Sequence, residues 1–318
     1  MTPLPCQTVL VTGAAGFLGR HLLNTIENSP HAPDRIIALD SRLRPPAENV
    51  SQITRINCDL TDRAATDEII RQTHPDGIIH LAGTAVADPL TCFNVNTRAA
   101  ANLLDAAAKL TSPPRVIIVG TAAQYGITAG DNVIVDENFP LNPLTPYALS
   151  KTMQEQWALH YARTGRVPLC CVRIFNIIGP GQSPNLVPAA FLQQLADVLA
   201  GRAEEISVGN TTTERDFTDV RDVTEALWKL LTTENDTNEQ VFNVASGRAV
   251  KIADLLDACL ALADREIPVR HDPARLKADD VPIIIGNNEK LRKTIDFSPT
   301  IDWRQSLQDM WQEIRPSE

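Results

Sequence analysis

The amino-acid sequence predicts an α/β protein with a doubly wound parallel sheet and a second, smaller α/β lobe. Two observations support this fold class. Short runs rich in valine and isoleucine alternate with helical stretches through about the first 176 residues, as buried parallel strands joined by crossover helices do. After that point the alternation becomes irregular and a loop rich in glycine and proline follows. We expect the later part to form the smaller lobe over the C-terminal edge of the sheet.

The first half supplies most of the sheet. Strands rich in β-branched residues are expected at 8–13, 35–40, 76–83, 115–123 and 168–180, and one more ends in the stretch CDLTD at 58–62. Helices are expected between them at 17–29, 65–74, 94–110 and 145–165. Pro146 suits the first turn of the last of these helices.

The second half continues with the expected helices 189–201, 223–234 and 252–263 and a strand at 240–246. Gly201 is a suitable stop for the first of these helices, and Asp222 is a candidate cap for the next. We expect one lobe to contain residues 1–175 and about 213–246, and the other to contain about 176–212 and 247–318.

Composition narrows the classes of function. The 318 residues carry a formal net charge of −10, which disfavours non-specific binding to nucleic acid. We expect no membrane span and no secretion signal, because no run of 18 apolar residues and no basic–apolar leader is found. The six cysteines form no C-x-x-C pair. We therefore expect a cytoplasmic protein with reduced thiols and no metal site.

A glycine-rich turn is the first candidate binding feature. Gly13, Gly16 and Gly19 follow a strand and open a helix, where free N–H groups and the helix dipole favour a pyrophosphate. Such glycines also occur for packing alone. Asp40 ends the next strand, 21 residues beyond Gly19, and a carboxylate there favours the ribose of NAD(H). Arg42 and Arg44 follow closely and favour NADP(H), which therefore remains the alternative cofactor.

Asp59 follows the third expected strand. It is a candidate contact for the adenine edge of a dinucleotide. The alternative is a helix cap for the next segment, and the sequence does not decide between the two.

Tyr147 and Lys151 form a candidate acid/base pair. They stand four positions apart on one expected helix and therefore share a face. A nearby ammonium lowers the pKa of a phenol, so this tyrosine could exchange a proton with a sugar hydroxyl. Thr121 ends the strand RVIIV and could hold the same oxygen. A tyrosine and a lysine at this spacing, taken alone, are also common on ordinary helix surfaces. The glycine turn and Thr121 favour the interpretation as an enzyme active site.

The motifs together resemble the extended short-chain dehydrogenase/reductases, the nucleotide-sugar epimerase/dehydratase family with a Rossmann-type dinucleotide lobe. The resemblance includes the glycine turn, HLAG at 80–83, NVN at 94–96, Thr121, Tyr147 and Lys151, and it spans nearly the whole chain. It implies that Thr121, Tyr147 and Lys151 are catalytic and that the protein is a homodimer. The cofactor-binding residues it implies are Gly13, Gly16, Phe17, Leu18, Gly19, Asp40, Arg42, Asp59, Leu60, Leu81, Ala82, Gly83, Asn96, Tyr147, Lys151 and Phe175.

Within that family, the second half resembles the GDP-4-keto-6-deoxy-D-mannose reductases. The segments RDFTDVRDV, FNVASGRAVKI and DPARLKADDVPIIIG carry the likeness. It implies a nucleotide-diphosphate sugar, with GDP favoured, bound by Thr121, Ala122, Asn176, Arg215, Lys277 and Asp280. The reductases usually have arginine then proline where Lys277 and Ala278 stand, and proline where Ile174 stands. Arg215 beside Asp216 and Asp219 also fits a plain surface ion-pair cluster.

The position two residues after Thr121 narrows the reaction. Dehydratases of the family carry an acidic residue there, and this chain has Ala123. We therefore expect NAD(P)H-dependent reduction of the C4 ketone of a GDP-4-keto-6-deoxyhexose, giving GDP-D-rhamnose or its C4 epimer. A nucleotide-sugar 4-epimerase is the first alternative, and a non-catalytic dinucleotide sensor or scaffold is the second. His80 we interpret as a core histidine.

Overall fold

The computed structural model describes residues 6–43, 52–86, 88–126, 134–275 and 284–315. Its larger lobe is built on a seven-stranded sheet in the order β12-β7-β5-β4-β1-β2-β3, and every neighbouring pair is parallel. The strands are β1 (Thr8–Thr12), β2 (Arg35–Asp40), β3 (Ile53–Asn57), β4 (Gly77–His80), β5 (Arg115–Thr121), β7 (Leu169–Ile174) and β12 (Val241–Val244). The predicted doubly wound α/β fold is confirmed.

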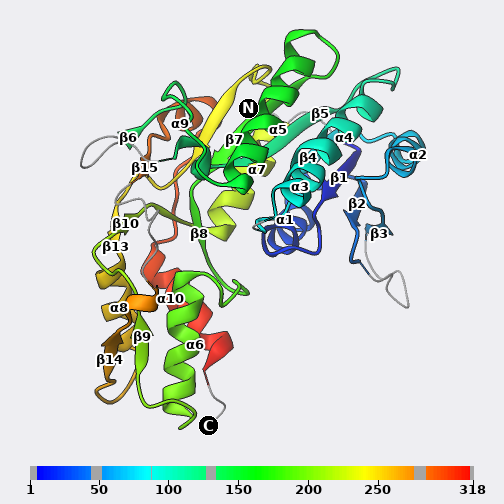
Figure 1. The fold of residues 1–318 in the computed structure, drawn as a ribbon. Coiled ribbons are helices and arrows are strands. Elements are labelled where there is room, and N and C mark those ends of the chain that lie inside the picture. The colour runs from blue at the N-terminus through cyan, green and yellow to red at the C-terminus, as the bar shows by residue number, and fades with distance from the viewer. Residues whose placement is uncertain (1–5, 44–51, 87, 127–133, 276–283, 316–318) are drawn as a thin grey trace.

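Helices cover both faces of this sheet (Figure 1). On one face α1 (Phe17–Glu27), α7 (Val220–Thr232) and α9 (Glu289–Ile295) pack with the sheet in one apolar core. On the other face α2 (Arg63–Thr73), α4 (Ala99–Ala107) and α5 (Pro146–Arg163) form a second core. Because both faces are buried, the strands are continuous apolar runs rather than alternating ones.

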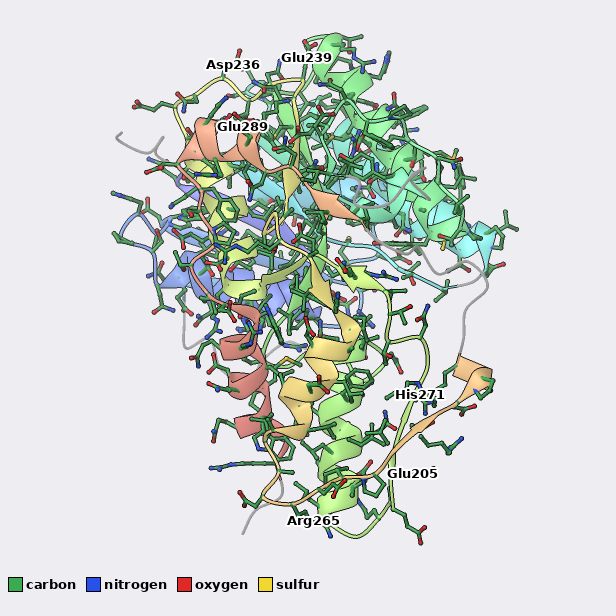
Figure 2. The ribbon with its side chains drawn as sticks, turned by 90° about the vertical axis from the view of Figure 1, so that its left-hand side faces the viewer. Glu205, Asp236, Glu239, Arg265, His271 and Glu289 are labelled. Atoms are coloured by element: carbon green, nitrogen blue, oxygen red, sulfur yellow. The ribbon has the colours of Figure 1, made fainter. Side chains whose placement is uncertain are left out.

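The smaller lobe has its own core around α6 (Val187–Leu199), α8 (Ile252–Leu260) and α10 (Trp303–Ile314). Its short strand pairs are β8 (Asn176–Ile178) with β11 (Phe217–Asp219), β9 (Ile206–Val208) with β14 (Val269–His271), and β10 (Glu214–Arg215) with β13 (Val250–Lys251). The 3-10 turn η3 (Pro273–Arg275) follows β14. In Figure 2, Arg265 and Glu205 lie near the far end of this lobe, while Glu289 lies at the opposite end of the molecule with Asp236 and Glu239.

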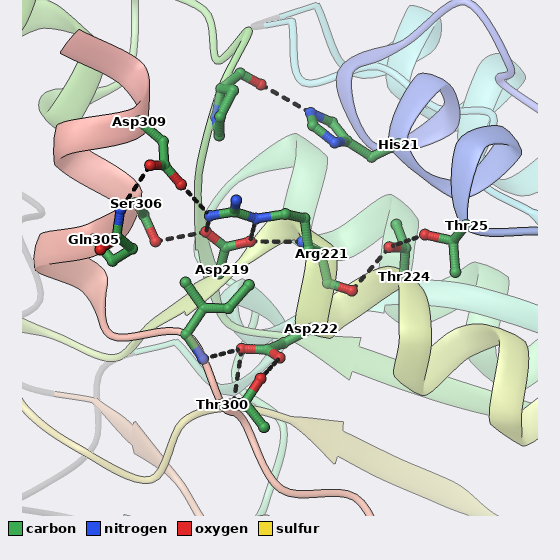
Figure 3. Close-up of polar contacts among 12 residues, drawn as sticks. His21, Thr25, Asp219, Arg221, Asp222, Thr224, Thr300, Gln305, Ser306 and Asp309 are labelled. Atoms are coloured by element: carbon green, nitrogen blue, oxygen red, sulfur yellow. Dashed lines mark hydrogen bonds and ion pairs between the residues drawn. The ribbon is translucent and has the colours of Figure 1, made fainter. Parts of the chain in front are cut away.

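The two lobes are joined by α7 as well as by the chain crossing at Phe175, which separates β7 from β8. Asp219 caps α7 and accepts hydrogen bonds from Arg221 and from Ser306 of α10, at 2.6 Å for the serine hydroxyl. Asp222, predicted as the cap of α7, instead lies in its first turn and accepts from the backbone and hydroxyl of Thr300 (Figure 3). These carboxylates therefore fix α10 of the smaller lobe to the larger lobe.

Several expected elements differ in detail from the structure, and the strand expected at 168–180 is divided at Phe175 into β7 and β8. The helix expected at 94–110 begins earlier as α3 (Pro89–Cys92), passes through a π-helical turn η1 (Phe93–Arg98) and ends with α4. The strand expected at 115–123 stops at Thr121, because a 3-10 turn η2 (Ala122–Tyr125) follows. The paired strands β6 (Ile134–Val135) and β15 (Ile285–Gly286) had no sequence signal. The predicted division of the chain into two lobes stays a prediction as to its exact limits.

Candidate active site

A groove with a volume of about 280 Å³ lies at the C-terminal ends of the central strands. Most of the residues expected to bind the adenosine half of a dinucleotide line it: Gly13, Gly16, Asp40, Arg42, Asp59, Leu60, Leu81, Ala82 and Gly83. The strands bring these residues together because the carboxyl ends of parallel strands meet at one edge of a sheet.

The glycine turn has the shape that a pyrophosphate needs. Gly13 has φ +68°, and a Cβ there would lie 2.7 Å from the backbone nitrogen of Ala82. The turn leads into α1, whose N-cap Gly16 makes no side-chain cap hydrogen bond. The first N–H groups of α1 thus have no side-chain cap beside the groove, which fits a bound dinucleotide phosphate. Gly19 is buried in the same helix and allows its close packing on the turn.

Asp40 is positioned at the end of β2 and is only 6% exposed. Its carboxylate accepts hydrogen bonds from the backbone N–H of Arg42 at 2.9 Å and of Ala15 at 3.2 Å. The exposed Arg42 side chain lies 3.6 Å from the same carboxylate. Arg44, the second arginine expected to favour NADP(H), lies outside the described residues.

Asp59 also borders this groove, and its carboxylate accepts a hydrogen bond from the N–H of Thr61 at 2.9 Å. The helix that follows, α2, is capped by Asp62, which accepts from Ala64 and Ala65. The alternative interpretation of Asp59 as a helix cap is therefore wrong.

A second cavity of about 280 Å³ continues from the groove and shares Leu81, Gly83 and Thr84 with it. Thr121, Tyr147 and Lys151 all line it, together with Leu18 and Phe175. Thr121 ends β5, while Tyr147 stands in the first turn of α5, where Thr145 caps the helix by accepting from Ala148 N–H at 3.1 Å. The structure thus brings the three predicted catalytic residues to one place.

Tyr147 and Thr121 line the same cavity, and the hydroxyl of Thr121 accepts the Ala123 N–H at 3.3 Å. Burial raises the pKa of Tyr147, the nearby Thr121 side chain opposes that shift, and the Cys92 thiol adds to it. The phenol is therefore protonated at neutral pH and is placed to donate a proton near Thr121.

Lys151 is only 4% exposed. Its ammonium donates to the Val119 carbonyl and to the Gln154 amide oxygen, at 2.9 Å each. Burial lowers the pKa of Lys151 to about 8. The expected lowering of the Tyr147 pKa by this lysine is not found, because burial is the largest influence on the tyrosine and raises its pKa.

A buried polar network lies behind Thr121 and was not predicted. Gln124 accepts the N–H of Thr121 at 2.9 Å and donates to Glu155 at 2.9 Å. Glu155 pairs with Arg173 through two hydrogen bonds of 2.9 and 2.6 Å. Arg173 in turn donates to the hydroxyl of Tyr125 at 3.0 Å. The network joins β5, α5 and β7 and holds the turn that carries Thr121.

A larger cavity, about 770 Å³, lies between the lobes and shares Ile177 with the Tyr147 cavity. Asn176 and Arg215, predicted to bind substrate, line it, and Phe17, predicted for the cofactor, lies here too. Gln182 also lines it, and among the described residues its buried amide oxygen has no hydrogen-bond partner. The predicted substrate residues Lys277 and Asp280 lie outside the described residues.

Besides Gly19 in α1, two predicted residues do not line these cavities. Asn96 is fully buried, and its amide bonds the backbone of Thr84 at 2.7 and 2.9 Å and the hydroxyl of Ser150 at 2.8 Å. It thus supports the Thr84 segment that borders both dinucleotide cavities. Ala122 is 7% exposed and packs in a small core with Tyr125 and Phe175.

His80 is fully buried, and its Nδ1 lies 2.9 Å from the Thr12 hydroxyl. Burial and the nearby Lys151 lower its pKa to about 3, so it is neutral. Its surroundings are those of a core histidine. Within the described ranges, no group of acidic, histidine or cysteine side chains is arranged to hold a metal ion.

Residues 9–245 match the model of the NAD dependent epimerase/dehydratase family. The chain belongs to this family. The match contains the glycine turn, Thr121, Tyr147 and Lys151, and the family confirms both the expected class of enzyme and a nicotinamide dinucleotide as its cofactor.

Members of the family with assigned activities are similar over nearly the full chain. The GDP-6-deoxy-D-mannose reductase of Pseudomonas aeruginosa is 29% identical over 95% of both chains. The UDP-glucose 4-epimerase of Bacillus subtilis is 26% identical over 96% of both. The structure of RMD from Pseudomonas aeruginosa complexed with NADPH has a TM-score of 0.82 and 27% identity, covering 96% of this chain and 98% of that one. The chain is thus a nucleotide-sugar epimerase or reductase in the broad sense.

Proposed function

We propose that this protein reduces the C4 ketone of a GDP-4-keto-6-deoxyhexose with NADH or NADPH. The observation that carries the proposal is that Tyr147 and Thr121 line one cavity, and that this cavity shares residues with both the dinucleotide groove and the cavity between the lobes. A sugar carbonyl bound at this junction would meet a proton donor and a second hydroxyl at one atom.

The protein's own groups divide the chemistry as follows. A bound dinucleotide supplies the hydride to C4. Thr121 holds the C4 oxygen, and the phenol of Tyr147 gives that oxygen its proton as negative charge develops. The raised pKa of Tyr147 keeps this proton in place before the reaction. The ammonium of Lys151, which lines the same cavity, would hold the nicotinamide ribose of that dinucleotide.

The residue after the Thr121–Ala122 pair argues against dehydration. Ala123 lies exposed at the start of η2, and alanine has no group to remove or return a proton. Elimination across C5–C6 of a hexose needs such an acid/base near the sugar. Reduction and epimerisation at C4 do not, because Tyr147 suffices for both.

The cavity between the lobes supports a nucleotide diphosphate as the remainder of the substrate. Its volume of about 770 Å³ is in the range of small-molecule sites. Arg215 offers a guanidinium for phosphate oxygens, and the unsatisfied oxygen of Gln182 offers an acceptor for a donor on the ligand. GDP as the nucleotide rests on the likeness to the Pseudomonas reductase, not on a base contact.

A nucleotide-sugar 4-epimerase is the competing function, and two observations favour it. The buried carboxylate of Asp40 is suited to the ribose of NAD rather than to a 2′-phosphate. A UDP-glucose 4-epimerase is also among the relatives. An epimerase would return the dinucleotide oxidised and would turn over without added NADH or NADPH.

The deciding experiment incubates the protein with NADH or NADPH and, in turn, GDP-, UDP-, CDP- and dTDP-4-keto-6-deoxy sugars, following the loss of absorbance at the reduced nicotinamide band. We expect oxidation with the GDP sugar and its loss in Tyr147→Phe. Turnover of UDP-glucose without added reductant would replace the reductase by the epimerase. If Tyr147→Phe left the biological activity of the protein intact, the hypothesis of a non-catalytic dinucleotide sensor or scaffold would replace that of an enzyme.

Two further parts of the proposal concern the setting of the enzyme. All six cysteines are free, which suits the reducing cytoplasm, and in the described parts of the chain no helix is long and apolar enough to cross a membrane. We also propose a homodimer that buries the outer face of α3, η1 and α5. Leu90, Leu149 and Trp157 on this face are 71%, 50% and 49% exposed. Trp157→Glu should shift the mass measured by light scattering to that of one chain.

A further inference from the structure

We propose that Gln154 is a positioning residue for Lys151: its amide oxygen and the Val119 carbonyl hold two of the three ammonium protons, and the third is aimed at the dinucleotide beside Gly83. The inference deepens the proposed function, since it rests on Lys151 binding the cofactor. Gln154 is fully buried on α5, one helical turn after Lys151.

The hydrogen bonds fix how Gln154 is oriented. Its amide oxygen lies 2.9 Å from the Lys151 nitrogen, and its amide nitrogen lies 3.2 Å from the Val119 carbonyl. A flipped amide would place NH₂ against NH₃⁺, donor against donor, and its oxygen against a carbonyl oxygen. The Val119 carbonyl thus anchors both the lysine and the glutamine, and Gln154 has one stable orientation.

The third proton of the Lys151 ammonium points toward the backbone of Gly83. A Cβ on Gly83 would lie 3.2 Å from the Lys151 nitrogen, so the ammonium is close to this backbone. Gly83 and Lys151 both line the cavity that holds Tyr147. A lysine with two donors already engaged by protein acceptors loses less freedom when it binds a ribose hydroxyl than a free one would.

Glutamine has a further property that glutamate lacks, which is its neutrality. Ionisable groups that interact with this part of α5 or with one another beside it include His80, Cys92, Tyr147, Glu155, Cys171 and Arg173. Glu155 is bound by Arg173, and His80 is neutral. Within the described part of the chain, Lys151 has no ion-pair partner, and burial alone accounts for its lowered pKa. Gln154 therefore holds the ammonium without neutralising its charge, which stays active toward the cavity.

The test measures the titration of Lys151 directly, without any sugar substrate. The side-chain carbons of ¹³C-labelled lysine are followed by NMR between pH 6 and 11, with Lys151→Arg used to assign the signal. We expect Gln154→Glu to raise the Lys151 midpoint by about one pH unit or more and Gln154→Leu to lower it. Thr232→Val is the matched control, because it removes a buried side-chain hydrogen bond at the end of α7, away from the site.

Dinucleotide affinity gives the second measurement, by calorimetry with NADH and the protein alone. Gln154→Leu should raise the dissociation constant about tenfold, while Thr232→Val leaves it unchanged. Unmoved Lys151 titration in both Gln154 variants, or an unmoved dissociation constant in Gln154→Leu, would overturn the inference. If both measurements move and none of the sugars is turned over, the proposed function fails and the role of Gln154 stands.

Discussion

Removal of one member of the buried Glu155–Arg173 pair tests the network behind Thr121. The side chains of Glu155 and Arg173 are 2% and 5% exposed. Glu155→Leu removes the acceptor of two Arg173 hydrogen bonds and one from Gln124. Arg173 would remain buried, and among the described residues its remaining acceptors would be the Tyr125 hydroxyl and the Glu137 carbonyl. We expect the free energy of unfolding to fall by about 3–5 kcal/mol, the range for a buried charge that loses its partner.

The assay is urea unfolding at pH 7, monitored by tryptophan fluorescence, with the slopes compared as well as the midpoints. The double variant Glu155→Leu/Arg173→Met removes the stranded charge, so its loss should be smaller than the sum of the two single losses by about 2 kcal/mol or more. Glu225→Gln is the control, because its pair with Lys229 is exposed and contributes little. A loss below about 1 kcal/mol in Glu155→Leu, or additive single losses, would refute the reasoning.

Three further predictions concern stability. Burial lowers the pKa of Lys151 from 10.5 to about 8, so between these pH values the unfolded chain binds the extra proton and the folded protein gains stability as pH rises. Lys151→Met should therefore raise the free energy of unfolding by up to about 3 kcal/mol below pH 8 and by progressively less toward pH 10.5. An equal effect at both ends of this range, measured by urea unfolding, would contradict the prediction. Asp62→Ala removes the cap of α2 and should lower the free energy of unfolding by about 1 kcal/mol, with loss of helix by circular dichroism at the midpoint; no loss would mean that the cap is replaced by water. Gly13→Ala should lower the free energy of unfolding by about 1–3 kcal/mol or more and abolish NADH binding in calorimetry. Gly165 has φ +66° but nothing within 4 Å of an added Cβ, so Gly165→Ala should show the cost of backbone strain alone. Equal losses of stability in the two variants would refute the close approach of Gly13 to Ala82.

Local sequence patterns were sufficient for the sheet and for the positions of the three residues proposed as catalytic. Apolar runs of β-branched residues predict buried parallel strands, and the four-residue spacing of Tyr147 and Lys151 places both on one helix face. Both residues lie close to Thr121 because all three line a cavity at the same edge of the sheet. These features depend on short-range order, which the sequence encodes directly.

Features that depend on side chains from distant elements were not predictable in this way. Glu155 and Arg173 lie on α5 and β7, and each reads alone as an ordinary surface charge. Gln154 carries no signal beyond its helix position, because its role comes from the Val119 carbonyl of β5. The pKa of Tyr147 is raised, whereas a lowered pKa was expected. Burial depends on the tertiary structure, and it outweighs the effect of a lysine whose ammonium donates to the Val119 carbonyl.

The position of β12 has a consequence for how the chain is made. This strand completes the sheet beside β7, yet the ribosome adds it only after β8, α6, β11 and α7. Until residue 244 emerges, a nascent chain that has formed β7 exposes one row of its backbone N–H and C=O groups along the apolar stretch LCCVRI. Such an open edge is a template for pairing with another chain. We therefore expect translation pauses before β12 to increase aggregation, and pauses after it to have no such effect.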